Sequence, residues 1–229
     1  MGNAESRLQS AELEDSLKRL YSSREYSDLT ISCDGRDHQV HKAIVCPRSE
    51  FFAAACRGAF EEERKATINL PDDDPQLVDI MVQYLYHLDY NTPSPAGRAN
   101  KPSHAKLTRK YRELTSDLVT HVMVYALAKK YDIRGLKSLA IQKFEAAVEK
   151  QWLTYSFLEA VQEIYTSTTE SDRELRDVVI STFYAHPDLL DKKATQVIFK
   201  ELGVLSYDLL MHLRHENCWP VVTKARSSR

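Results

Sequence analysis

The stretch that decides the fold is Tyr26–Arg57, which reads YSDLTISCDGRDHQVHKAIVCPRSEFFAAACR. Its first part alternates apolar and polar residues, and the turn signal Asp34-Gly35 separates it from a second short alternating run. This pattern predicts a β-hairpin. Pro47 ends a short apolar helix, and Ser49 is placed to cap the helix that follows. The stretch therefore predicts a small sheet that leads directly into helices.

Further signals on both sides extend this pattern. Residues 67–70 (TINL) predict a third strand, and Asp72-Asp73-Asp74-Pro75 predicts a helix start, because acidic side chains and proline favour the first turn. Ser171 with Glu174 predicts a capping box, and Gly203 predicts the end of a helix. Helical periodicity is found at 4–22, 117–132, 134–149, 153–166, 172–185, 191–201 and 206–215. The predicted fold class is α+β, helix-rich with one small three-stranded sheet and an all-helical extension.

Composition sets limits on the kind of protein. The chain has 229 residues, of which 43% are apolar and 28% charged, as expected of a soluble globular protein. A net charge of −2 gives no global attraction to nucleic acid or anionic membranes, and no apolar run approaches the roughly 20 residues that span a bilayer. The four cysteines form no C-x-x-C pair, and no signal peptide is evident. We expect an intracellular protein of the cytoplasm, the nucleus or both.

Four blocks of sequence resemble the BTB/POZ domain family. They match its opening strand, its "F-x-V-H-K-x-x-L" signature, the "R-S-x-x-F" that follows and the late "L-x-x-A-x-K-Y-x-x-x-x-L-K", and they lie at Tyr26–Ile31, His38–Val45, Arg48–Phe52 and Tyr125–Lys137. The resemblance implies a BTB/POZ fold over residues 23–149, with a basic loop inserted at 91–116. An N-terminal helix (1–22) would precede it and a helical extension (150–229) would follow. The polar motif residues are expected to satisfy backbone groups where sheet and helices meet, and they are Asp28, His41, Lys42, Arg48 and Ser49.

The resemblance implies two interaction functions. BTB domains commonly pair with a second copy, and here the apolar face of the N-terminal helix is the candidate dimer element, with Leu13, Leu17, Leu20 and Tyr21. The alternative is that these residues cover the chain's own core. Many members also dock a cullin scaffold as ubiquitin-ligase adaptors through a hydrophobic-x-Glu triplet, which Phe60, Glu61 and Glu62 match. The alternatives are that Phe60 faces the core, and that the chain is a dimerisation scaffold or transcription-associated factor without cullin binding.

Other signals are weaker. The basic insertion is read as a solvated loop, since Tyr111 is its only aromatic residue and a single-strand nucleic-acid binder needs more. Gly2 fits an N-myristoylation pattern, which on its own gives marginal membrane affinity. His212, His215 and Cys218 have metal-binding chemistry but lack a fourth ligand. No catalytic, cofactor or metal motif is recognised, so we expect protein partners, no small-molecule substrate, no cofactor and no enzymatic activity.

Overall fold

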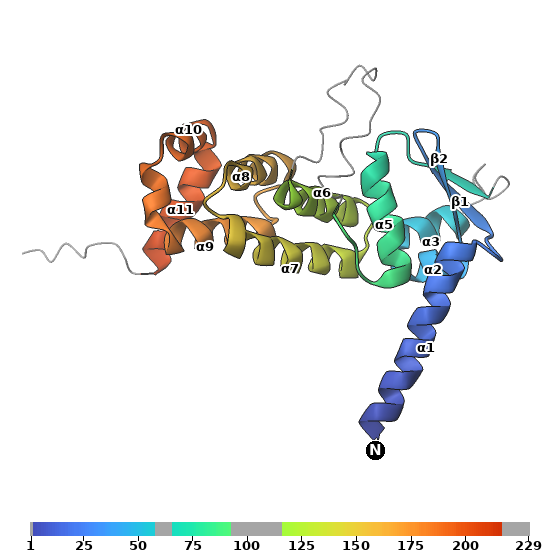
Figure 1. The fold of residues 1–229 in the computed structure, drawn as a ribbon. Helices are drawn as coiled ribbons and strands as arrows, with labels where there is room; N and C mark the ends of the chain where they lie inside the picture. Colours follow the sequence, from blue (N-terminus) through green and yellow to red (C-terminus); the bar gives the residue numbers. More distant parts are fainter. Residues whose placement is uncertain (1, 58–65, 93–115, 217–229) are drawn as a thin grey trace, which may run out of the picture. The chain divides into compact units, whose positions relative to one another are not determined.

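The computed structural model describes residues 2–57, 66–92 and 116–216, apart from the side chains of residues 2–8 and 10. The chain divides into two compact units, Met1–Ala146 and Ala147–Arg229, and each is described by itself (Figure 1). Among the described residues, no helix is both long and apolar enough to cross a membrane.

The first unit contains a three-stranded sheet. Strands β1 (Leu29–Cys33) and β2 (Arg36–Val40) pair antiparallel, and β3 (Thr67–Asn69) pairs parallel to β1 on its other side. The order is therefore β2-β1-β3. This confirms the small three-stranded sheet predicted from the sequence.

The hairpin turn follows from its two central residues. Asp34 and Gly35 both have positive φ, 46° and 78°, as a type I′ turn requires. This turn matches the twist of the two strands and fixes their register. Alternate side chains of β1 then face the core, where Leu29, Ile31 and Cys33 are buried.

Helix α5 (Pro75–His87) is the central helix of this unit. It contacts α1, α2 and α6 (Figure 1). Much of its surface is buried, including Val78, Met81, Val82 and Leu85. The other helical elements of the unit are α1 (Gly2–Ser23), α2 (Lys42–Val45), the 3-10 helix η1 (Cys46–Arg48), α3 (Glu50–Arg57) and α6 (Asp117–Lys130). Helix α7 (Arg134–Gln151) contributes residues to both units.

The acidic run before α5 has two functions. Asp74 caps the helix by accepting a hydrogen bond from the Gln76 amide at 2.7 Å, and Pro75 occupies the first turn. The predicted helix start is thus confirmed. Asp73 differs from the prediction, because it is buried and points to α6 rather than to the start of α5.

The regular secondary structure of the second unit is entirely helical over the residues that the structure describes. Its core contains large side chains such as Phe157 and Phe183, whose rings lie 5.6 Å apart. The elements are α8 (Tyr155–Ser167), α9 (Glu174–Ala185), η3 (Pro187–Asp191), α10 (Lys193–Glu201) and α11 (Gly203–His215). The predicted all-helical extension is confirmed.

Two helix boundaries in this unit differ from the prediction. The capping box is wrong: α9 begins after Arg173, which makes no side-chain cap, and the Ser171 hydroxyl lies 3.1 Å from that of Thr169 instead. Gly203 does not end a helix either. It is the first residue of α11, and Leu202 caps α10 through its amide, which donates to the Ile198 carbonyl.

Candidate partner-binding surfaces

Asp28 and His41 join the loop after α1 to the start of α2 and to α5. Asp28 Oδ1 accepts a hydrogen bond from the Lys42 amide at 2.7 Å. The Tyr86 hydroxyl accepts from the His41 amide at 2.9 Å and lies 2.7 Å from His41 Nδ1, while Nε2 lies 2.7 Å from the Glu25 carbonyl oxygen. Because that carbonyl can only accept, Nε2 donates to it, and Nδ1 pairs with the Tyr86 hydroxyl. His41 thereby links the loop after α1 to α5.

Arg48 and Ser49 hold the beginning of α3 in place. Arg48 Nη1 donates to the Leu85 carbonyl at the end of α5. The Ser49 hydroxyl donates to the Tyr131 carbonyl at 2.6 Å and accepts from the Phe52 amide at 3.2 Å, which is an N-cap contact. Helix α3 is therefore attached at its first turn to both α5 and the end of α6.

Tyr131 and Asp73 form a buried polar contact that the sequence analysis did not identify. The Tyr131 hydroxyl donates to Asp73 Oδ2, and Lys130 Nζ lies 2.7 and 2.8 Å from the two carboxylate oxygens. Burial, followed by the hydrogen bond with Asp73, raises the pKa of Tyr131 well above its usual value. The Phe52 ring stacks on Tyr131 at 5.5 Å. The sequence signal nearest to this contact is the lysine and tyrosine of the "A-x-K-Y" block, which does not name Asp73 as their partner.

One side of α3, the helix that precedes the candidate cullin triplet in the sequence, is exposed. Phe51 is 41% exposed although its ring contacts Tyr131 at 4.8 Å. Arg57, the last residue of α3, forms an ion pair with Glu50 at 3.4 Å. Phe60, Glu61 and Glu62 lie outside the described residues, as do residues 93–115 of the predicted basic insertion.

The candidate dimer residues differ in their contacts. Tyr21 packs on α5 of its own chain, with its ring 5.4 Å from Tyr86 and 4.8 Å from His87. Leu17 and Leu20 are half-buried, whereas Leu13 is 63% exposed. The apolar face of α1 is therefore packed against its own domain at Tyr21, and it becomes more exposed toward the N-terminus, at Leu13.

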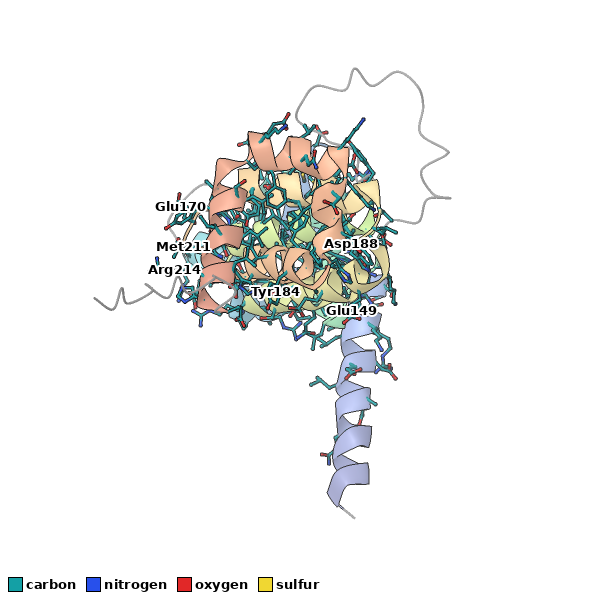
Figure 2. The ribbon with its side chains drawn as sticks, turned by 90° about the vertical axis from the view of Figure 1, so that its left-hand side faces the viewer. Glu149, Glu170, Tyr184, Asp188, Met211 and Arg214 are labelled. Carbon is teal, nitrogen blue, oxygen red and sulfur yellow. The ribbon has the colours of Figure 1, made fainter. Side chains whose placement is uncertain are left out.

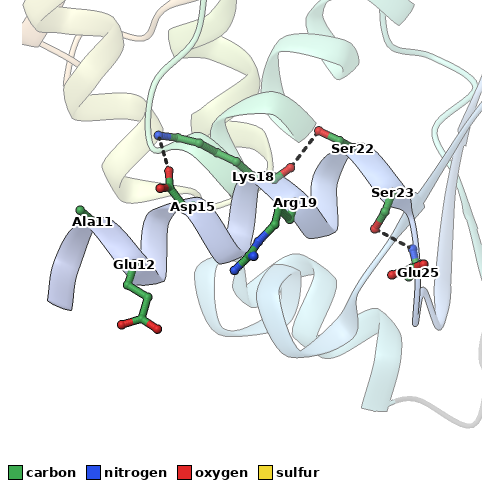
Figure 3. Close-up of a pocket in the computed structure, with 8 residues that line it drawn as sticks. All are labelled: Ala11, Glu12, Asp15, Lys18, Arg19, Ser22, Ser23 and Glu25. Carbon is green, nitrogen blue, oxygen red and sulfur yellow. Dashed lines mark hydrogen bonds and ion pairs between the residues drawn. The ribbon is translucent and has the colours of Figure 1, made fainter. Parts of the chain in front are cut away.

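The opposite face of α1 is polar. At 100° per residue it lies roughly half a turn from Leu13 and Leu17, and it borders an open concavity of about 1160 Å³ (Figure 3). Lys18 and Asp15 form an ion pair at 3.7 Å on this face, and the Ser22 hydroxyl donates to the Lys18 carbonyl at 2.9 Å. These groups pair with one another along the helix, an arrangement typical of a solvated helix face rather than of a ligand site.

A buried polar network fixes α11 in the second unit. Asp208 accepts from Arg173 at 2.7 Å and from the Tyr165 hydroxyl at 2.9 Å. Arg176 stacks over the Tyr165 ring at 4.6 Å and donates to the Thr168 carbonyl at 2.7 Å. The turn between α8 and α9 is thereby attached to α11, which determines the side of α11 that faces solvent.

That solvent-facing side of α11 is apolar. Figure 2 shows the end of the second unit at which Tyr184, Met211 and Arg214 are labelled. His212 packs edge-on against Tyr184, with the ring centroids 5.1 Å apart. Cys218 lies outside the described residues. Among the residues that the structure describes, no group of three or more His, Cys, Asp and Glu could hold a metal ion. The exposed apolar side chains of α11 are Val204, Tyr207 and Leu210.

Comparison with known proteins identifies the first unit. The BTB/POZ domain family model matches residues 17–147, more than half of the chain. Kelch-like protein 41 of Mus musculus is 31% identical over 78 residues, 34% of this chain and 13% of that protein. Leucine-zipper-like transcriptional regulator 1 of Homo sapiens is 32% identical over 71 residues, 30% of this chain and 8% of that protein. The chain thus matches only a small part of either relative. It belongs to the BTB/POZ domain family, whose domain is a protein–protein interaction module.

Proposed function

We propose that this chain is a homodimeric BTB adaptor that docks a cullin scaffold so that a recruited target is ubiquitinated. The observation that carries the proposal is the firm attachment of α3, through Ser49 and Phe52, to Tyr131. The hydrophobic-x-Glu triplet Phe60–Glu62 begins three residues after this helix ends at Arg57. In the adaptors of this family, that is where the cullin-contacting triplet is found.

The chemistry of the triplet suits a docking contact. An aromatic side chain that fills a pocket on the partner supplies most of the binding free energy of a small interface. A neighbouring carboxylate, Glu62, would pair with a cation at the rim and fix the register of the two surfaces. Phe51, exposed on the first turn of α3, is a further apolar side chain of this unit that a partner could cover.

The helical extension would provide the surface for a target. Val204, Tyr207 and Leu210 give α11 an exposed apolar side, and the network around Asp208 keeps that side turned outward. Aromatic residues on a fixed helix lose little conformational entropy when they are buried by a partner. The basic insertion is the other segment through which a target could be recruited.

Calorimetric titration of the full chain with a cullin N-terminal domain tests the proposal. Phe60→Ala/Glu62→Ala should weaken binding by roughly thirtyfold or more, since loss of an aromatic anchor costs about 2 kcal/mol. Glu63→Ala, in the same acidic run but outside the triplet, is the matched control and should bind like the parent. If the parent protein binds no cullin domain while its circular dichroism shows it folded, the adaptor proposal is wrong.

The second candidate function is a dimerisation scaffold or transcription-associated factor that does not bind cullin. It is favoured by the relative whose name describes a transcriptional regulator. The same titration separates the two functions, because a scaffold would still dimerise but give no heat with the cullin domain.

A further inference from the structure

Two thiols meet beside α3. Cys46 begins η1, and its Sγ lies 3.7 Å from the Phe52 carbonyl oxygen, to which it donates. Cys56 lies one turn further along α3, so in the α-helical pattern its amide donates to the same carbonyl oxygen. The Cys46 thiol and the Cys56 backbone thus converge on one atom. A helical side chain leans over the turn N-terminal to its own Cα, so the Cys56 side chain lies over the turn whose carbonyl accepts from Cys46.

The environment of Cys46 agrees with this placement. Burial, followed by a hydrogen bond with the Cys56 thiol, raises the pKa of Cys46 to about 11. Neither cysteine is in a disulfide, and both are half-buried, so small solutes can reach them. Cys33 provides a contrast within the same domain, because it is buried and donates to the Asp73 carbonyl at 3.3 Å.

We propose that Cys46 and Cys56 are a redox-active thiol pair that closes to an intramolecular disulfide when the protein meets a peroxide. One thiolate attacks the peroxide: a sulfur–oxygen bond forms, the oxygen–oxygen bond breaks, and hydroxide leaves. The second thiol then attacks the sulfenic acid, forming the sulfur–sulfur bond as the hydroxyl leaves as water. Overall, two thiols and one hydrogen peroxide give one disulfide and two waters. A dithiol reductant reverses the reaction by exchange.

The environment of Cys46 assigns a role to each thiol. The thiolate is the form that reacts with peroxide, and the raised pKa keeps Cys46 protonated at neutral pH. Cys56 is therefore the thiol that peroxide oxidises first, and Cys46 is the thiol that resolves the sulfenic acid. The disulfide would join η1 to the last turn of α3, and its formation does not depend on cullin binding.

Peptide mapping of the full chain after mild hydrogen peroxide treatment and alkylation of free thiols tests the proposal. The Cys46 and Cys56 peptides should appear cross-linked, with a mass lower by about 2 Da than the sum of the free peptides, because two hydrogens are lost. Dithiothreitol should reverse the cross-link. Cys46→Ser should stop at a sulfenic acid on Cys56, whereas Cys56→Ser should react much more slowly. Cys33→Ser is the matched control and should cross-link like the parent.

The native fold must be responsible for the selectivity. In concentrated urea Cys46 should pair with Cys33 as readily as with Cys56, because the two sequence separations are similar and loop closure costs almost the same. A native map in which Cys33 or Cys218 is the partner of either thiol would overturn the proposal. So would accumulation of sulfinic acid with no cross-link. The parent protein alone decides these outcomes, even where a serine variant unfolds.

Discussion

Tyr131→Phe is expected to destabilise the BTB unit by about 2 kcal/mol. The change removes only the hydroxyl that donates to the buried Asp73 carboxylate, and the aromatic ring keeps its stacking on Phe52. Loss of a hydrogen bond to a charged group typically costs about 1.5–3 kcal/mol. We expect the middle of this range, because Lys130 still contacts both carboxylate oxygens after the change.

Packing and ion pairing should contribute little to this figure. The phenylalanine ring fills nearly the volume of tyrosine, so the cavity term is small. The Lys130 side chain is 49% exposed, and solvent screens its attraction to Asp73. The hydroxyl, in contrast, is buried, so its hydrogen bond to the carboxylate is not weakened by solvent in this way.

Urea unfolding followed by circular dichroism gives the free-energy change, and hydrogen exchange of the peptides that cover β1 and β2 assigns it to this unit. A double-mutant cycle with Asp73→Asn isolates the pair, and the coupling energy should be about 1.5 kcal/mol or more. Tyr155→Phe, at an exposed tyrosine of the other unit, is the matched control and should stay within about 0.5 kcal/mol of the parent. If Tyr131→Phe also falls within that margin, the argument for Asp73 is refuted.

Three further changes follow from the contacts. Burial lowers the pKa of His121 to about 4, so the unfolded chain binds a proton at a higher pH than the folded chain does. The free energy of unfolding should therefore fall by up to about 3 kcal/mol as pH decreases from about 6.5 toward 4, and that of His121→Gln should depend less on pH. Leu13→Glu should weaken self-association in analytical ultracentrifugation, because Leu13 is exposed in the single chain. An unaltered dimer would exclude Leu13 from the interface. A β-carbon at Gly135 would collide with the Tyr84 hydroxyl, so Gly135→Ala should cost about 1–3 kcal/mol in chemical unfolding, and a neutral result would show that Tyr84 moves aside.

Structure that depends on local sequence could be predicted. The Asp34-Gly35 turn, the alternation along β1 and the cap at Asp74 all act within a few residues, and the structure contains each of them. The capping box failed because a second local contact competes with it. The Ser171 hydroxyl is near Thr169, and Arg176 holds the preceding turn through the Thr168 carbonyl.

Contacts between distant residues could not be derived from spacing. Asp72, Asp73 and Asp74 are identical in type, and only the approach of α6, 57 residues later, separates the buried partner of Lys130 from the helix cap. The resemblance identified Lys130 and Tyr131 as family residues, but a motif does not say which side chain they meet. The same holds for Cys46 and Cys56, which lie ten residues apart and form no C-x-x-C pair in the sequence.

The two alternatives for α1 describe different parts of one helix. A helix of 22 residues is about 33 Å long, and Tyr21 fixes only its final turns against α5. Covering the chain's own core accounts for Tyr21 and for the half-buried Leu17 and Leu20, but it gives no reason for apolar Leu13 one turn earlier. Burying that side chain would contribute roughly 1–2 kcal/mol per protomer. A two-fold contact between copies would bury Leu13 of both protomers. The exposed N-terminal part of α1 therefore favours self-association, even though its C-terminal part is already packed on α5.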